Sequence, residues 1–247
     1  YNRENEVKEG KHMEQRKILI LTGNFGMGHR CVAEAIRQQL AAMHTHAQIQ
    51  VLDLMDALFP NSSALLYRGF AQMVHYCPSL YNQLNKITGR CSTLPMQAWI
   101  ADKMKELLKD AEIVVSTFPL CAQFAAMYKR KYHASTALYT YITDIGAQDE
   151  WIVPDTDLYF VGAQETKLDL LYKGVAPHSI HVCGIPVRQD FFHPVRQEHS
   201  GKTEILLMGG GLGLLPSAED CLSVLSRCDS MHVTVITGKN QALYDTL

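Results

Sequence analysis

The feature that most constrains the fold of this chain is a strand that runs into a glycine-rich turn and continues as a helix. The sequence ILILTGNFGMGHRCVAEAI, Ile18 to Ile36, starts inside a continuously apolar segment at 17–22, which is typical of a strand buried on both faces. Apolar residues then recur at helical spacing in 31–43, and a second strand is predicted at 49–55. This order indicates a strand–helix–strand unit with parallel strands.

The alternation of helices and strands continues along the chain. Residues 59–109 have a helical pattern and are rich in aromatic side chains. Four further strands are predicted, at 111–117, 136–143, 158–162 and 179–184. Such alternation is typical of a parallel sheet that is covered by helices on both faces.

The pattern starts again after a break. Residues 183–202 contain two prolines and few periodic apolar positions, which is typical of a linker, and from residue 203 the order strand, glycine turn and helix recurs. We therefore expect an α/β chain with two Rossmann-like domains, at 13–195 and 196–247. The second is expected to be truncated, because it holds too few strands, and the polar residues 1–12 resemble a leader or tag.

Both glycine turns have the features of a phosphate site. A strand-to-helix turn directs free backbone N–H groups, and the positive end of the helix dipole, into the space above it. The first turn lacks the spacing of a dinucleotide-binding motif, and the segment GKN at 238–240 lacks the spacing of a P-loop. Tight strand-to-helix packing without a ligand is the alternative for each turn. The candidate phosphate-binding residues are Gly26 and Gly28 in the first turn and Gly209, Gly210, Gly211 and Gly213 in the second.

Composition excludes several classes of function. A net charge of -2 argues against nucleic acid as the principal partner. Seven cysteines without a C-x-x-C pair argue against a disulfide framework or a zinc site and suit a reducing cytoplasm. No apolar run reaches the roughly 18 residues of a membrane-spanning helix, and no signal peptide is visible.

Three ordered motifs resemble the monogalactosyldiacylglycerol synthase and processive diacylglycerol glucosyltransferase family. They are LTGNFGMGHRCVAEAI, the block from YITD to CGIPVR, and LLMGGGLGLLPS with VITGKNQAL. The resemblance as a whole covers about 17–247. The resemblance implies the two-domain GT-B architecture of the family 28 type, with a lipid acceptor in the first domain and a UDP-sugar in the second. It implies inverting transfer without a catalytic metal or cofactor, from UDP-glucose or UDP-galactose to diacylglycerol or a similar lipid.

The resemblance also assigns roles at the first turn, which would hold the reacting end of the donor beside the acceptor hydroxyl. His29 is the candidate base, because an imidazole with a pKa near 6.5 accepts a proton at cytoplasmic pH. Asn24 would orient the hydroxyl or the histidine. The alternative for His29 is a helix-cap or phosphate-contact role. Thr143 and Asp144 match the family pattern, and Asp144 is either a second polar group at the cleft or a residue that caps a turn.

A membrane surface is expected in the aromatic stretch 59–99. Leu66, Tyr67 and Phe70 interleave there with Arg68, which suits a helix at the level of the lipid headgroups, although the same stripe also fits a helical core. The family resemblance places the protein in the cytoplasm, peripheral on the inner face of the cell membrane.

Two other functions stay open. One is a related GT-B transferase with an acceptor other than diacylglycerol, and the other is a lipid- or nucleotide-binding module without catalysis. The sequence departs from the family at Gln148 and Val153, where members commonly carry histidines, and at Leu212, where they often carry an acidic residue. We also expect the 247-residue form to be inactive alone.

Overall fold

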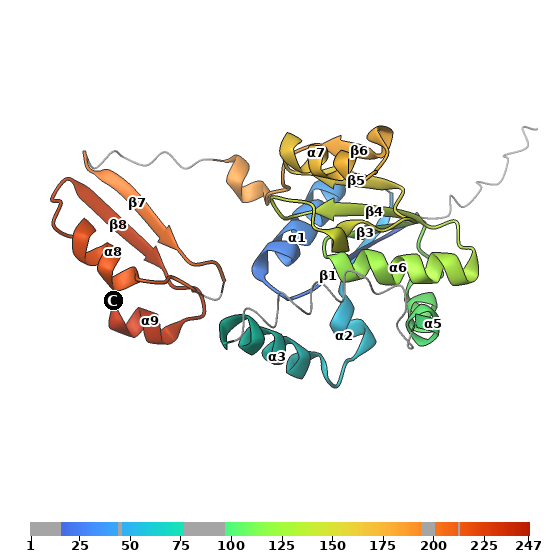
Figure 1. The fold of residues 1–247 in the computed structure, drawn as a ribbon, viewed down its shortest axis with the longest axis horizontal. Coiled ribbons are helices and arrows are strands. Elements are labelled where there is room, and N and C mark those ends of the chain that lie inside the picture. The colour runs from blue at the N-terminus through green and yellow to red at the C-terminus, as the bar shows by residue number, and fades with distance from the viewer. Residues whose placement is uncertain (1–15, 44–45, 77–96, 194–200, 212) are drawn as a thin grey trace, which may run out of the picture.

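The computed structural model describes residues 16–43, 46–76, 97–193, 201–211 and 213–247 and forms two separate parallel sheets (Figure 1). The first sheet has six strands in the order β2-β1-β3-β4-β5-β6, and every neighbouring pair is parallel. Its strands are β1 Lys17–Thr22, β2 Gln48–Asp53, β3 Ile113–Ser116, β4 Ala137–Ile142, β5 Leu158–Val161 and β6 Ile180–Val182. The predicted strands are thus confirmed.

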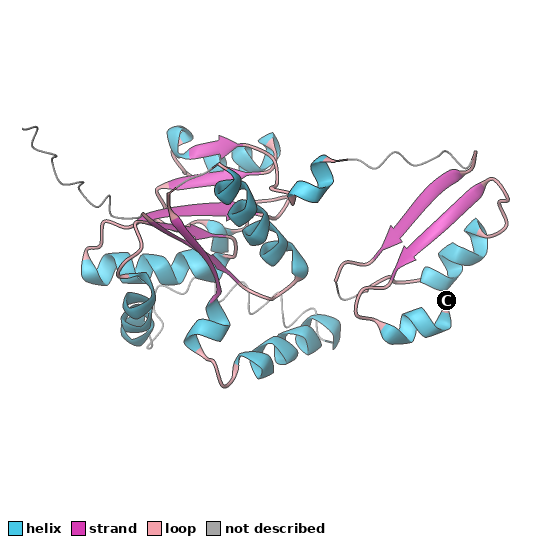
Figure 2. Cartoon of the chain, turned by 180° about the vertical axis from the view of Figure 1, so that it is seen from behind, coloured by secondary structure: helices cyan, strands magenta, loops and turns pink. Residues whose placement is uncertain are grey.

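Helices cover both faces of this sheet (Figure 2). Helix α1 packs against β1 and β2, whereas α6 packs against β3 and β4 and is itself covered by α5. The helices are α1 Met27–Ala42, α2 Leu54–Leu58, α3 Ser63–Tyr76, α5 Gln97–Leu108, α6 Pro119–Tyr132 and α7 Gln164–Tyr172, with short 3₁₀ turns η1 Asp149–Trp151, η2 Pro177–Ser179 and η3 Gln189–Phe192.

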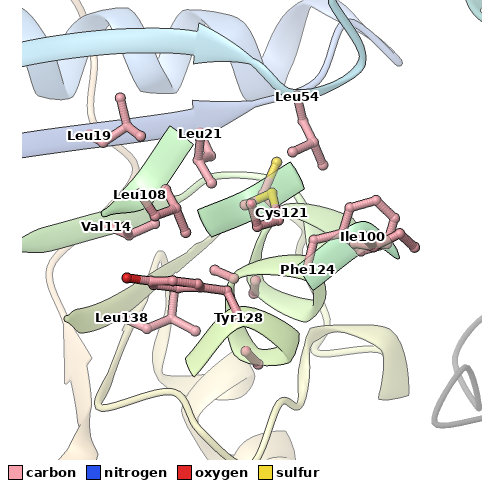
Figure 3. Close-up of a cluster of buried hydrophobic side chains, with 14 of the residues drawn as sticks. Leu19, Leu21, Leu54, Ile100, Leu108, Val114, Cys121, Phe124, Tyr128 and Leu138 are labelled. Atoms are coloured by element: carbon pink, nitrogen blue, oxygen red, sulfur yellow. The ribbon is translucent and has the colours of Figure 1, made fainter. Parts of the chain in front are cut away.

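The apolar sequence of β1 follows from its position inside the sheet. Successive side chains of a strand point to opposite faces. Leu19 and Leu21 join the cluster formed with α5 and α6, which Figure 3 shows, whereas Ile18 and Ile20 pack on the side of α1 with Ala33. Both faces of β1 are therefore buried, as its uninterrupted apolar run predicts.

The second sheet repeats the pattern of the first. Its strands β7 Thr203–Met208 and β8 Met231–Ile236 are parallel, with α8 Ala218–Leu225 between them and α9 Gln241–Thr246 after them. This confirms the predicted recurrence of strand, glycine turn and helix. The predicted boundary between 195 and 196 falls within 194–200, and the predicted leader within 1–15, both outside the described residues.

Candidate functional site

The candidate site lies where the order of strands in the first sheet reverses. The chain leaves β1 for β2 on one side, whereas β3 lies on the other side of β1. Because all strands are parallel, the segments that follow β1, β3 and β4 meet at one edge of the sheet. Crevices at this carboxyl edge are the usual ligand sites of open α/β sheets.

The first glycine turn connects β1 to α1, which begins at Met27, four residues earlier than its apolar periodicity indicates. Its N-cap residue is Gly26, which has no side chain to cap the first turn. Gly26 has φ 152° and ψ 162°, a conformation that residues with side chains rarely adopt. A Cβ added to Gly26 or Gly28 would meet no atom of another described residue within 4 Å, apart from chain neighbours and the backbone of the helix itself, so the space beside both glycines is open in the described part of the chain. The protein itself has no steric need for glycine at position 28.

His29, in the first turn of α1, is held by residues that follow β3 and β4. Its Nδ1 lies 2.8 Å from Oγ1 of Thr143, and its ring meets Phe118 edge-on, with centroids 5.0 Å apart. Burial lowers the pKa of His29, while the charge of Asp144 and a hydrogen bond with the Thr117 backbone raise it, and the net direction is down. The structure therefore brings the predicted residues His29, Thr143 and Asp144 together, with His29 neutral at pH 7.

Asp144 makes one side-chain hydrogen bond and acts on His29 through its charge. Its Oδ2 accepts a hydrogen bond from Nε1 of Trp151 at 2.8 Å, and Trp151 is fully buried. This bond anchors the loop between β4 and η1, which is a structural role. The same carboxylate also acts electrostatically on His29, because its charge favours the imidazolium form. Val153, which stands at one of the two positions where the family commonly has histidines, is buried in the core and has no place at this site.

The second glycine turn, after β7, is packed against its own domain. A Cβ on Gly209 would lie 2.6 Å from the backbone of Leu214, and one on Gly213, which has φ 65°, would lie 1.8 Å from the carbonyl oxygen of Thr237. The backbone N–H groups of Gly213 and Leu214 donate within the turn, to the carbonyl groups of Gly210 and Gly209. Gly209 and Gly213 are therefore explained by tight packing, whereas a Cβ on Gly210, with φ 66°, would meet open space.

The two glycine turns approach one another. A Cβ on Gly211 would lie only 2.2 Å from Cγ of Met27, the first residue of α1. In Figure 1 the loop after β7 extends toward the first sheet on the side of α1. Gly210, Gly211, Gly26 and the start of α1 thus border the same region.

Asn24 is positioned through its backbone by groups that the sequence motifs do not indicate. Its N–H donates to the hydroxyl of Tyr67 at 3.1 Å, and that hydroxyl donates to Asp53. Phe25 stacks on Phe118, with ring centroids 4.9 Å apart. These contacts join segments far apart in the sequence, so only the order of strands and the position of α3 reveal them.

The residues predicted for membrane contact divide between the two faces of α3. Leu66, with 43% of its surface exposed, and Arg68 face outward, whereas Tyr67 is half-buried against the core. The side chain of Phe70 and residues 77–96 lie outside the part of the chain that the structure describes. Among the described residues, no helix combines the length and apolarity needed to cross a bilayer.

A cavity lies away from this site, and the described residues offer no cluster of ligands for a metal ion. A cavity of about 960 Å³ opens at the opposite, amino edge of the first sheet, lined by Lys17, Lys105 and Tyr132 among others. It shares no residue with the glycine turns. Within the described ranges, no group of three or more His, Cys, Asp and Glu side chains has an arrangement that could hold a metal ion.

The family model described as monogalactosyldiacylglycerol (MGDG) synthase matches residues 29–187. A processive diacylglycerol beta-glucosyltransferase of Staphylococcus aureus is 25% identical over 95% of this chain, and the chain spans 63% of that relative's length.

Two solved structures share the fold. The Staphylococcus aureus MnaA structure with UDP aligns with a TM-score of 0.54 at 11% identity, over 94% of this chain and 65% of the other. The Arabidopsis thaliana UGT89C1 structure, complexed with UDP-L-rhamnose, aligns with a TM-score of 0.53 at 8% identity, over 94% of this chain and 67% of the other. At such identities the likeness concerns the arrangement of the two sheets, and it agrees with the expected two-domain GT-B architecture.

Proposed function

The chain belongs to the monogalactosyldiacylglycerol synthase family, and from this premise we propose that the protein is a glycosyltransferase that moves a hexose from a UDP-sugar to diacylglycerol or a similar membrane lipid. We further propose that the transfer inverts the anomeric carbon and needs no metal. The 247-residue form is proposed to be inactive alone, because it spans only part of the length of its relatives.

The observation that carries the proposal is the setting of His29. Its imidazole lies at the carboxyl edge of the sheet and is held by a hydrogen bond with Thr143. Burial lowers its pKa, which favours the neutral form. The glycines next to it have open space beside them. A general base must be unprotonated at the working pH and rigidly oriented, and this arrangement meets both needs.

In the proposed reaction His29 takes the proton of the acceptor hydroxyl, with Asn24 orienting that hydroxyl. The hydroxyl oxygen attacks the anomeric carbon of the hexose from the face opposite to UDP. The bond between the anomeric carbon and the phosphate oxygen breaks, and UDP leaves with the electron pair. The product is a glycosidic bond of inverted configuration, and the proton on His29 passes to solvent.

The diphosphate of the donor is proposed to lie between the two glycine turns. Gly26 and Gly28 beside the start of α1, and Gly210 in the second turn, leave open space there, and the amino-terminal end of a helix favours a negative charge. Gly209, Gly211 and Gly213 would support the site by shaping the turn rather than by contact.

Membrane association is proposed to be peripheral, on the cytoplasmic side, through the outer face of α3. Leu65 and Leu66 are 74% and 43% exposed, and Arg68 beside them is also exposed. Apolar side chains next to a cation suit a helix that lies among anionic headgroups.

The proposal is tested by transfer from labelled UDP-glucose and UDP-galactose to vesicles that contain diacylglycerol, with the full-length protein in EDTA. Labelled glycolipid of inverted configuration is the expected result. Donor binding in calorimetry without transfer to diacylglycerol or a similar membrane lipid, but with transfer to a different kind of acceptor, would favour the related transferase. Vesicle binding without any binding of UDP or UDP-sugar would instead identify a lipid-binding module.

A further inference from the structure

The hydroxyl of Tyr67 lies between the first glycine turn and the start of α2. It accepts a hydrogen bond from the backbone N–H of Asn24 at 3.1 Å and donates one to Oδ1 of Asp53. The same Oδ1 accepts the backbone N–H groups of Met55 at 3.0 Å and Asp56 at 3.2 Å, which caps α2. The hydroxyl thus joins a capped helix to the turn through hydrogen bonds that polarise one another.

The phenol keeps this donor role over the physiological pH range. Burial raises the pKa of Tyr67, the Asn24 N–H opposes this, and the hydrogen bond and charge of Asp53 add to the rise. Tyr67 therefore stays protonated, so its O–H can donate to Asp53 while its oxygen accepts from the Asn24 N–H.

A row of aromatic rings extends the contact from Tyr67 to His29. The rings of Tyr67 and Phe25 meet edge-on at 4.8 Å, Phe25 stacks on Phe118 at 4.9 Å, and Phe118 meets His29 edge-on at 5.0 Å. The turn is consequently fixed at two points, at the backbone of Asn24 and at the ring of Phe25.

Tyr67 belongs to a helix whose described side chains are mostly exposed. Among the α3 side chains that the structure describes, 63–69, only Ser63 and Tyr67 are not exposed. Leu66 and Arg68, its direct neighbours, belong to the outer face proposed for membrane contact. Helix α3 therefore contacts the first glycine turn through Tyr67.

We propose that Tyr67 is a positioning residue for the transfer reaction, which holds the backbone of Asn24 from helix α3 and so fixes the turn from which Asn24 and His29 face the acceptor. This inference rests on the proposed function. It also makes α3 a link between the lipid surface and the acceptor side of the site.

The test is Tyr67→Phe in the full-length protein, which removes the hydroxyl and keeps the ring. Because a positioning hydrogen bond next to a carboxylate is lost, kcat for hexose transfer is expected to fall roughly 10-fold or more, while KM for the UDP-sugar stays within about twofold. The Asn24 amide loses its acceptor, so its hydrogen exchange, followed by NMR, becomes faster.

Tyr132→Phe is the matched control. The Tyr132 hydroxyl also donates to a carboxylate, that of Asp102, but it lies at the cavity on the amino edge of the sheet. This variant loses the same atom and the same kind of hydrogen bond, and it is expected to leave both kcat and the exchange of Asn24 unchanged. If Tyr67→Phe does not fold, Asp53→Asn replaces it as the test. Asparagine keeps the cap of α2 and weakens the hydrogen bond from Tyr67 without removing it. A smaller fall in kcat is therefore expected.

Wild-type kcat in a folded Tyr67→Phe protein overturns the inference, as does an equal fall in Tyr132→Phe. If the wild-type protein transfers no hexose to any lipid acceptor, the proposed function fails by itself. The role of Tyr67 is then decided by hydrogen exchange alone. Faster exchange at Asn24 in Tyr67→Phe, but not in Tyr132→Phe, supports it. Wild-type exchange in both variants refutes it.

Discussion

The two glycine turns look alike in the sequence, but they differ in what surrounds their glycines. Beside Gly26 and Gly28 an added Cβ would meet no atom within 4 Å from the other residues that the structure describes. At Gly209 and Gly213 it would collide with the backbone of the same domain, at 2.6 Å and 1.8 Å. The first turn thus combines open space with a fixed histidine, and the second is shaped mainly by its own packing. A glycine pattern predicts a close approach, but the approaching group is either a ligand or the protein itself.

The largest expected effect tests whether the first turn carries the chemistry. His29→Ala in the full-length protein is expected to lower kcat for hexose transfer by about 10²- to 10⁴-fold, because the general base is lost. His178→Ala, at an exposed position in η2, is the control and is expected to keep wild-type transfer. Wild-type transfer by the His29 variant at saturating substrate would leave this histidine with a structural role only.

The next effect concerns the packing of the second turn. Gly213→Ala is expected to lower the free energy of unfolding by about 2 kcal/mol or more, because positive φ costs about 1–2 kcal/mol and the new methyl group adds a collision with Thr237. Urea unfolding of the 247-residue chain measures the change.

Gly201→Ala separates the two contributions to this loss. Gly201 has φ 73° but open space around its Cβ position, so only the backbone cost applies there. If both variants lose equal stability, the collision at Gly213 is relieved by a small shift of the loop, and the contrast between the two turns becomes weaker.

The sequence predicts the fold well because burial and chain order leave clear periodic signals. The apolar run of β1 and the alternation of strands and helices are sufficient to predict a parallel sheet. The recurrence of this pattern after residue 203 is sufficient to predict a second sheet. The grouping of His29, Thr143 and Asp144 follows in part from the same logic, because parallel strands end at one edge.

The supporting contacts of the site could not be predicted in this way. Tyr67 carries the signal of a membrane-facing aromatic residue, yet its hydroxyl contacts Asn24 and Asp53. The direction of a side chain on a short amphipathic helix depends on how that helix is docked, which local periodicity does not fix. Trp151 likewise reveals its bond to Asp144 only once the loop between them is folded.

A smaller effect is expected at the open glycine of the first turn. Gly28→Ala is expected to leave the free energy of unfolding unchanged or to raise it by less than about 1 kcal/mol, since alanine suits a helix better than glycine. In the full-length protein the same variant is expected to raise KM for the UDP-sugar, because the methyl group enters the proposed phosphate space. A marked loss of stability would show that both turns are packed in the same way.

The smallest effect is a shift in pH dependence, and it tests how the surroundings of the first turn adjust His29. The pKa of His29 lies below its ordinary value of 6.5, and the charge of Asp144 opposes this lowering. Asp144→Asn keeps an oxygen for Trp151 but removes the charge, so the pKa falls further and the acid limb of kcat/KM moves to lower pH.

The free energy of unfolding also depends on pH through His29, and it falls in the same direction, toward low pH. Because the folded-state pKa of His29 is lowered, its contribution to the free energy of unfolding is fully present above pH 6.5. This contribution is lost as the pH falls from 6.5 toward the folded-state pKa. In Asp144→Asn, where the folded-state pKa is lower still, the loss continues to lower pH. Asp149→Asn, which removes an exposed charge paired with Lys173, is the control and is expected to leave the acid limb in place. An acid limb that moves in neither variant would mean that the group titrating in catalysis is not His29, and the contrast between a chemical and a structural glycine turn would then lose its main support.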